Sequence, residues 1–222
     1  VGSEMCIRDR YYTNLPKVHD YLAEFKRDVL DFYDCFTVGE GPRMEPEVAL
    51  SYVREGKDKV LDMMINFAHM EADCFITDFL QRPFDLVKLK KAFTKWQTKM
   101  YGKGWNALYM ENHDHPRIIS RYGSEKYRVE SGKSIAASYL FQRGTPFVYQ
   151  GQEIGMINTP LASLDDYKDI MVKNNARIAR SLGLSKETVL RLAQKASRDN
   201  ARTCMQWSGA PNAGFTNGKP WF

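Results

Sequence analysis

The chain has 222 residues, of which 43% are hydrophobic and 13% aromatic, a composition typical of a globular protein with one sizeable core. Its 32 basic and 27 acidic residues are interspersed and leave a net charge of +5, which excludes a basic tail for nucleic acid. No apolar run approaches the roughly 20 residues that a membrane-spanning helix needs.

The first half of the chain predicts two helices and two strands in alternation. Apolar residues recur at helical spacing from Val18 to Val29, and Pro46 is a residue type that often opens a helix. Short apolar runs, one of them ending in Gly39-Glu40, are typical of buried strands. The predicted elements are a helix over 17–30, a strand over 35–40, a helix over 46–54 and a strand over 63–67.

An outer amphipathic helix is predicted next. At 100° per residue one face carries lysines and the opposite face carries apolar side chains. The lysines are Lys88, Lys91, Lys95 and Lys99, and the apolar residues are Leu86, Leu89, Phe93, Trp96 and Met100. After it we expect a strand over 105–109, a helix over 125–142, a strand over 146–150, helical structure over 165–195 in which Ser185 caps a helix ending near Ala196, and irregular chain over 197–222.

Four alternations of strand and helix predict a parallel α/β sheet or barrel. Polar residues follow three of the strands, at Glu40, at His113-Asp114 and from Gln150 to Glu153. In a (β/α)8 barrel the loops after the strands form the active-site face. Four units make half of such a barrel and leave two open strand edges.

Two carboxyl groups that flank one bond are what glycoside hydrolysis needs. A strand-end glutamate such as Glu40 is, taken alone, more often a surface residue. For His113 and Asp114, the spacing alone fits two interpretations equally well: a hydrogen-bonded pair in a loop, or a functional site. Their joint position after separate strands favours a functional site.

Longer motifs surround these residues. They are Thr37-Val38-Gly39-Glu40, the run from Glu111 through Asp114 to Gly123, the run Gly144–Met156, and Ser197-Arg198-Asp199-Asn200-Ala201-Arg202-Thr203-Cys204-Met205-Gln206-Trp207 followed by Asn212–Thr216. From about residue 15 to its end the chain resembles the α-amylase superfamily, glycoside hydrolase family 13, in its oligo-1,6-glucosidase branch. The resemblance implies the C-terminal half, strands five to eight, of a (β/α)8 TIM barrel.

The resemblance also implies a role for each site residue. Glu40 would be the general acid/base, and Asp114 would bind the sugar 2- and 3-hydroxyls and stabilise the oxocarbenium-like transition state. His113 would hydrogen-bond the same glucose. Arg198 and Arg202 would lie at the glucose pocket as fixed fork donors. The implied activity is a retaining α-glucosidase that cleaves terminal α-1,6 or α-1,4 bonds of short oligosaccharides.

The family's nucleophile is an aspartate after strand four, two residues after an arginine, and no such motif occurs here. We therefore expect this chain to be a fragment that is inactive alone. The segment Val1–Arg10 resembles a translated adapter or assembly artefact. The predicted domains are this segment, a partial barrel over 11–160, and a helical and irregular part of the same domain over 161–222. No cofactor is expected, and any calcium site of the family would lie in the missing N-terminal part.

Two other protein classes stay open. The pair His113-x-His115 resembles metal ligands of amidohydrolases, although no histidine follows His115. A non-catalytic relative that accompanies amino-acid transporters is the second alternative. Within the enzymes, trehalose 6-phosphate is an alternative substrate, and sucrose isomerisation is disfavoured by the run Ser120–Gly123.

The expected partner is an oligosaccharide, with no nucleic acid and no membrane, and the expected enzyme is a monomer. Its four cysteines form neither a CxxC pair nor an even framework, which favours a reducing compartment. With no hydrophobic signal core at the N-terminus, the expected location is the cytoplasm.

Overall fold

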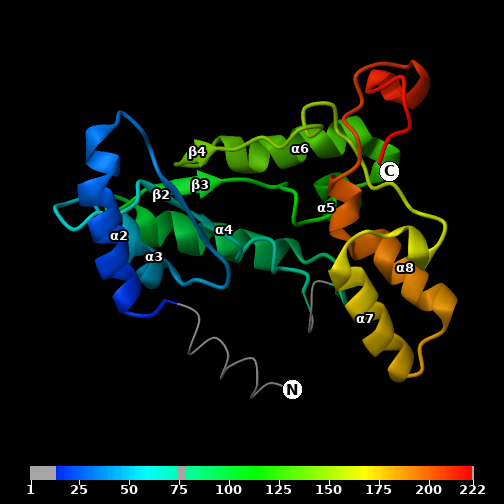
Figure 1. Cartoon of the computed structure of the whole chain (residues 1–222), viewed down its shortest axis with the longest axis horizontal. Helices are drawn as coiled ribbons and strands as arrows, with labels where there is room; N and C mark the ends of the chain where they lie inside the picture. The colour runs from blue at the N-terminus through cyan, green and yellow to red at the C-terminus, as the bar shows by residue number, and fades with distance from the viewer. Residues whose placement is uncertain (1–13, 75–78, 222) are drawn as a thin grey trace. The chain divides into compact units, whose positions relative to one another are not determined.

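The computed structural model describes residues 14–74 and 79–221, in which short strands alternate with helices (Figure 1). The suspected artefact Val1–Arg10 lies outside the described residues. In chain order the elements are α2 (Lys17–Asp28), η1 (Leu30–Phe32), β1 (Val38–Gly41), α3 (Pro46–Val53), β2 (Met63–Asn66), α4 (Leu86–Met100), β3 (Asn106–Leu108), α5 (Ile118–Tyr122), η2 (Glu125–Tyr127), α6 (Arg128–Leu140), β4 (Thr145–Pro146), η3 (Leu164–Asp166), α7 (Ile170–Ser181), α8 (Lys186–Ala196), η4 (Arg198–Ala201) and η5 (Pro211–Gly214).

The strands form one sheet in the order β1-β2-β3-β4. β1 pairs with β2 in parallel, with Val38 opposite Met63, and β2 pairs with β3 in parallel, with Met64 opposite Asn106. Parallel neighbours need a crossover connection, and α3 and α4 supply one after β1 and one after β2. The predicted parallel α/β sheet is confirmed.

The described chain divides into two compact units. The first unit has its core where α3, β2 and α4 pack together. That core contains Ala49, Leu50, Tyr52, Val53, Val60, Met64, Trp96 and Met100, all buried. The predicted lysine face of α4 is also observed, since Lys95 pairs with Glu45 and Lys99 lies 2.9 Å from Glu47. Leu86, expected on the apolar face, is 57% exposed in the first turn.

Two glycines of β1, Gly39 and Gly41, lie against a closely packed layer of side chains. A Cβ at Gly39 would lie 2.7 Å from the Leu61 side chain and 2.8 Å from the Met64 side chain, so a larger residue there would require both side chains to move. Gly41 is similarly crowded by Met44. Because successive residues of a strand point to opposite faces, Glu40 points away from that layer, and it is exposed.

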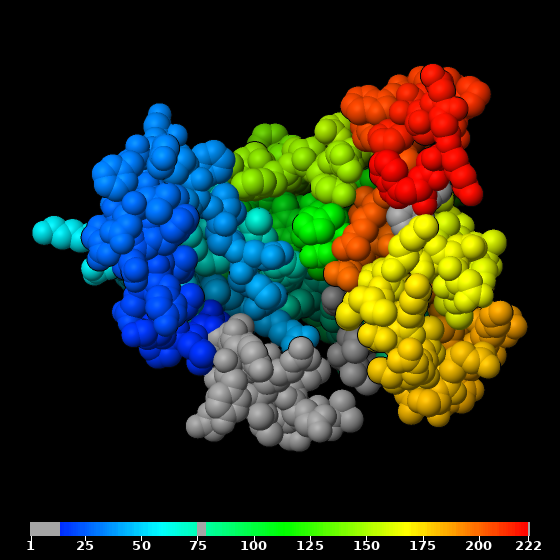
Figure 2. Space-filling model, viewed as in Figure 1, coloured from blue at the N-terminus to red at the C-terminus, as the bar shows by residue number. Residues whose placement is uncertain are grey.

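The predicted helix over 17–30 is α2, but none of its residues is buried. Val18 and Leu22 pack partly against the first core. Figure 2 shows the α2–η1 stretch, in blue, at the surface. Large apolar side chains lie exposed on α2, on η1 and just after it: Tyr21, Phe25, Phe32, Tyr33 and Phe36.

The second unit has a core built around the α7–α8 hairpin (Figure 1). Small residues line the contact, which lets the two helices approach closely: Ala176, Ala179, Ala193 and Ala196. The predicted cap is confirmed, since the Ser185 hydroxyl accepts a hydrogen bond from the backbone N–H of Thr188 at 3.2 Å. α8 ends at Ala196, as expected.

One predicted strand was too long, and one short helix was not predicted. The strand expected over 146–150 is only Thr145–Pro146. The Phe147 N–H still bonds to the Leu108 carbonyl at 2.7 Å, but the chain then turns, with the Gln152 N–H bonded to the Tyr149 carbonyl at 2.9 Å. The short helix α5 was not predicted, since five residues are too few to display a helical period. In the two described stretches of the chain, no helix is both long and apolar enough to cross a bilayer.

Candidate active site

Asp114 lies in the loop that follows β3, in the second unit. The side-chain oxygen of Asn112 accepts a hydrogen bond from the Asp114 N–H at 2.9 Å, a local turn that holds the loop backbone. The Asp114 side chain is 30% exposed, so solvent or a ligand can reach it. This loop therefore presents a carboxylate that is oriented but not covered.

Two arginines converge on one oxygen of this carboxylate. Arg198 Nη1 donates to Asp114 Oδ1 at 3.0 Å, and Arg202 Nη2 donates to the same oxygen at 2.9 Å. Arg202 also donates from Nε to the backbone carbonyl of His113 at 2.9 Å. Both arginines stand four residues apart at the ends of η4, so one short turn delivers both guanidinium groups.

The second carboxylate oxygen has a different neighbour. His113 Nε2 lies 3.6 Å from Asp114 Oδ2, and the His113 side chain is 65% exposed. Oδ1 is thus held by two cations, while Oδ2 faces an exposed imidazole. Such an edge, with an acceptor oxygen and a ring nitrogen side by side, can bind neighbouring hydroxyl groups of a polyol.

Asp169, at the start of α7, holds Arg198 in place. Arg198 donates to Asp169 from Nε at 2.8 Å and from Nη2 at 2.7 Å, a two-pronged contact with a side chain that is 2% exposed. Burial acts to raise the pKa of Asp169, but the hydrogen bonds from Arg198 and the Met171 N–H outweigh it and the pKa is lowered. The same contact with Asp169 raises the pKa of Arg198.

A fully buried ion pair anchors the chain behind this loop. Arg117 Nη1 donates to Glu111 at 3.0 Å and to the Gln150 carbonyl at 2.8 Å. Glu111 also accepts from the Ile118 N–H at 2.9 Å. Burial raises the pKa of Glu111, and Arg117 opposes that shift. Gly151 is needed here, because its φ is +91° and a Cβ would meet Met156 at 2.3 Å and Arg117 at 3.1 Å.

The two histidines of the His113-x-His115 pair have different surroundings. His113 is exposed beside Asp114, whereas His115 is 5% exposed, with its Nδ1 3.5 Å from Arg121 Nη1 and its ring stacked on Tyr109. A cation beside a ring nitrogen disfavours a metal ion there. Among the described residues no three metal-ligating side chains form a cluster.

Glu40 belongs to the first unit, near the end of β1. It stands opposite Ile65 of β2 in the parallel register. The structure thus brings together His113, Asp114, Arg198 and Arg202 in the second unit and describes Glu40 within the first.

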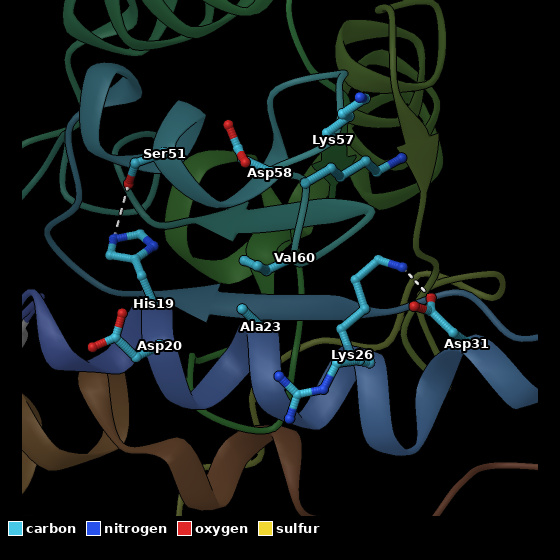
Figure 3. A pocket seen from close by; sticks show the side chains of 11 residues that line it. His19, Asp20, Ala23, Lys26, Asp31, Ser51, Lys57, Asp58 and Val60 are labelled. Atoms are coloured by element: carbon cyan, nitrogen blue, oxygen red, sulfur yellow. Dashed lines mark hydrogen bonds and ion pairs between the residues drawn. The ribbon is translucent and has the colours of Figure 1, made fainter.

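The first unit also has a groove of about 570 Å³ beside α2 (Figure 3). His19 and Ser51 face each other there at 3.3 Å, and Lys26 pairs with Asp31. Lys59 is held by Asp62 at 3.0 Å. Two of the lysines that line the groove are thus paired with neighbouring acids.

Sequence reasoning missed Asp169 and the hydrogen bonds of Asp199. The Asp199 carboxylate, 2% exposed as a residue, accepts from the N–H groups of Lys168 and Asp169 at 2.8 and 3.0 Å. Asp169 is the N-cap of α7 and accepts from the Met171 N–H. A helix-start signal at Asp169 was available in the sequence, but its partner 29 residues later was not.

The model of the alpha-amylase catalytic domain matches residues 3–222. The chain is 44% identical over 223 residues to the oligo-1,6-glucosidase of Parageobacillus thermoglucosidasius, covering 99% of this chain and 40% of that protein. The crystal structure of Bacillus licheniformis trehalose-6-phosphate hydrolase is similar at a TM-score of 0.88 and 42% identity, over 96% of this chain and 39% of that one.

A MutB variant crystallised with glucose is similar at a TM-score of 0.89 and 36% identity, over 100% of this chain and 40% of that one. The chain therefore spans about 40% of the length of the relatives that it matches. Together with the parallel sheet, these likenesses identify the fold as part of a TIM barrel.

Proposed function

Because the chain belongs to the α-amylase family through its catalytic domain, we propose that it is the acid/base-bearing half of a retaining α-glucosidase barrel. One observation carries the proposal: Arg198 and Arg202 meet on a single oxygen of Asp114 and leave its other oxygen beside His113. A carboxylate that two guanidinium groups orient in this way suits a sugar whose ring gains positive charge in the transition state.

In the proposed reaction Glu40 protonates the leaving glycosidic oxygen, and in the second step it takes a proton from water. Asp114 accepts hydrogen bonds from two hydroxyls of the glucose ring and stabilises the developing charge. His113 donates to the same ring. Arg198 and Arg202 hold Asp114, and Arg202 helps to recognise the non-reducing end of the sugar.

Retaining hydrolysis requires a second carboxylate about 5 Å from the acid, which attacks the anomeric carbon. The family's arginine-x-aspartate motif for that group is absent from the 222 residues. We propose that this chain does not turn over substrate by itself and acts only when the complementary strands of a barrel are present. Residues 11–160 would then be barrel and residues 161–222 its continuation.

The preferred substrates are short oligosaccharides with terminal α-1,6 or α-1,4 glucosyl bonds, as the name of the Parageobacillus relative suggests. Trehalose 6-phosphate is the second candidate, since the hydrolase named for it is 42% identical over nearly all of this chain. We place the enzyme in the cytoplasm as a monomer. The sequence upstream of residue 11 in the genome would test both the nucleophile and the location.

A chimera tests the activity directly. Residues 11–222 of this chain replace the matching 40% of the Parageobacillus enzyme, which supplies the other barrel strands. We expect the chimera to hydrolyse isomaltose and the 222-residue chain alone to have no activity. Net retention, seen as the α-anomer of glucose by NMR at early times, is also expected. A folded chimera without activity, or one that inverts, would contradict the proposal.

Glu40→Gln in the chimera tests the acid role. Turnover of isomaltose should fall roughly 10³-fold or more, about 4 kcal/mol of barrier. The loss should be smaller for cleavage of a dinitrophenyl α-glucoside, because a good leaving group needs no proton. Glu24→Gln, at an exposed position of α2, is the matched control and should change nothing. Equal losses on both substrates would remove Glu40 from the role of acid.

A further inference from the structure

The start of α7 and the turn η4 hold each other through two reciprocal contacts in the second unit. In one, the Arg198 guanidinium donates to the Asp169 carboxylate at 2.7 and 2.8 Å. In the other, the Asp199 carboxylate accepts from the N–H groups of Lys168 and Asp169 at 2.8 and 3.0 Å. Two consecutive residues of η4 are thereby tied to two consecutive residues before α7.

This arrangement restricts where Arg198 can point. Both Asp169 and Asp199 are buried, at 4% and 2% exposure, so the anchor is rigid, whereas the Arg198 side chain is 31% exposed. With Nε and Nη2 occupied by Asp169, the planar guanidinium leaves Nη1 for Asp114 Oδ1, at 3.0 Å. The direction of that last hydrogen bond is therefore determined by Asp169.

Arg202 reaches Asp114 by a different route. Its Nε is bonded to the His113 carbonyl, which belongs to the same loop as Asp114. Arg202, which caps the end of η4, therefore ties Asp114 and its loop backbone to η4. Arg198 ties Asp114 to α7 as well, through Asp169. Of these two contacts, the one from Arg198 links the carboxylate to α7.

We propose that Asp169 is a positioning residue of the sugar site, which acts through Arg198 to set the orientation of the Asp114 carboxylate. The proposal rests on the proposed function, in which Asp114 stabilises the transition state. A misplaced charge weakens transition-state stabilisation more than it weakens substrate binding. Loss of Asp169 should therefore lower kcat much more than it changes KM.

Asp169 is also the N-cap of α7, and the test must separate the two roles. Asparagine caps a helix about as well as aspartate, so Asp169→Asn keeps the hydrogen bond to the Met171 N–H and removes the charge that holds Arg198. Asp165→Asn is the matched control, because Asp165 is an exposed carboxylate four residues earlier, in η3.

In the chimera, Asp169→Asn should lower kcat on isomaltose by about tenfold to hundredfold and change KM by less than about threefold. Asp165→Asn should leave both constants unchanged. In an Arg198→Met background, Asp169→Asn should lower kcat by less than about twofold, because the group through which it acts is gone. A merely structural Asp169 would lower kcat by the same factor in both backgrounds, and that result would overturn the proposal.

A crystal structure of the Asp169→Asn chimera gives a readout that needs no activity. We expect Arg198 Nη1 to leave the Asp114 oxygen, from which it is 3.0 Å away in the unsubstituted chain. An unchanged contact would overturn the proposal whatever the kinetics show. If the parent chimera folds but does not hydrolyse isomaltose, the proposed function fails, and this contact still decides whether Asp169 positions Arg198.

Discussion

The second unit contains two arginine–aspartate systems that differ in how accessible the carboxylate oxygens are to solvent or a ligand. Arg121 and Asp73 are joined by two hydrogen bonds, Nε to Oδ2 at 2.9 Å and Nη2 to Oδ1 at 2.6 Å, with side chains 0% and 3% exposed. Asp114 is also held by arginines, but it is 30% exposed and both of its arginines touch only Oδ1.

The difference separates an ion pair that organises the fold from one that is arranged for a ligand. In the buried pair both carboxylate oxygens accept from Arg121, and the Tyr122 hydroxyl also donates, at 3.4 Å. Arg121 reaches in addition the Met70 carbonyl. Burial raises the pKa of Tyr122, so that its hydroxyl stays a donor. Asp114, by contrast, is more exposed to solvent, and its Oδ2 accepts no hydrogen bond from either arginine.

The largest effect is expected when Asp114, which Arg198 and Arg202 hold, is replaced. Asp114→Asn should lower isomaltose turnover by the chimera by roughly 10³-fold or more, about 4 kcal/mol, because the charge that stabilises the transition state is lost. Its thermal midpoint should fall only slightly, since ion pairs between side chains that are about one-third exposed contribute little to stability. Turnover kinetics and a calorimetric melt check this. A large fall in stability with intact turnover would reverse the comparison.

The buried system should respond in the opposite way. Asp73→Asn leaves the Arg121 charge buried without a counter-charge and should destabilise the folded state by about 3–5 kcal/mol. Turnover per folded molecule, measured well below the melting transition, should be unchanged. Asp165→Asn is again the control and should shift stability by less than about 0.5 kcal/mol. Urea unfolding of the two variants measures both values.

The fork of Arg202 offers a finer test. Arg202 donates a hydrogen bond from Nε to the His113 carbonyl and another from Nη2 to Asp114 Oδ1. Lysine keeps the charge but has one compact head group, so Arg202→Lys should lower kcat/KM by about tenfold to hundredfold, or about 1.4–2.7 kcal/mol. Arg180→Lys, at an exposed position of α7, is the matched control. Full activity of Arg202→Lys would mean that charge alone suffices.

The smallest expected effect is a dependence of stability on pH. The pKa of Asp169 lies below the ordinary value of 3.8, so its ionised form stabilises the fold above that pH, and the contribution is lost as the pH falls through the lowered pKa. Asp169→Asn should therefore cost roughly 1–2 kcal/mol at pH 7 and progressively less below about pH 4. Melts of parent and variant from pH 7 to 3 measure this. A difference that grew on acidification would contradict it.

Much of the local structure could be predicted because it depends on neighbours in the sequence. The helical period of 17–30, the proline that opens α3 and the Ser185 cap are all local signals, and each prediction was confirmed. The shortened β4 and the helix α5 were not foreseen, because the first depends on what the chain bonds after Pro146 and the second is stabilised by Glu111, which accepts from its first N–H.

The sequence by itself determined the alternation of strands and helices, the family to which the chain belongs, and which residue types stand at the strand ends. It named His113, Asp114, Arg198 and Arg202 as candidates, but not how they meet. Only the tertiary structure decided that both guanidinium groups bind the same oxygen and that Asp169 holds one of them. The reason is physical: local spacing controls backbone hydrogen bonds within a turn, whereas a contact across 84 residues, such as Arg198 to Asp114, exists only once the chain has packed.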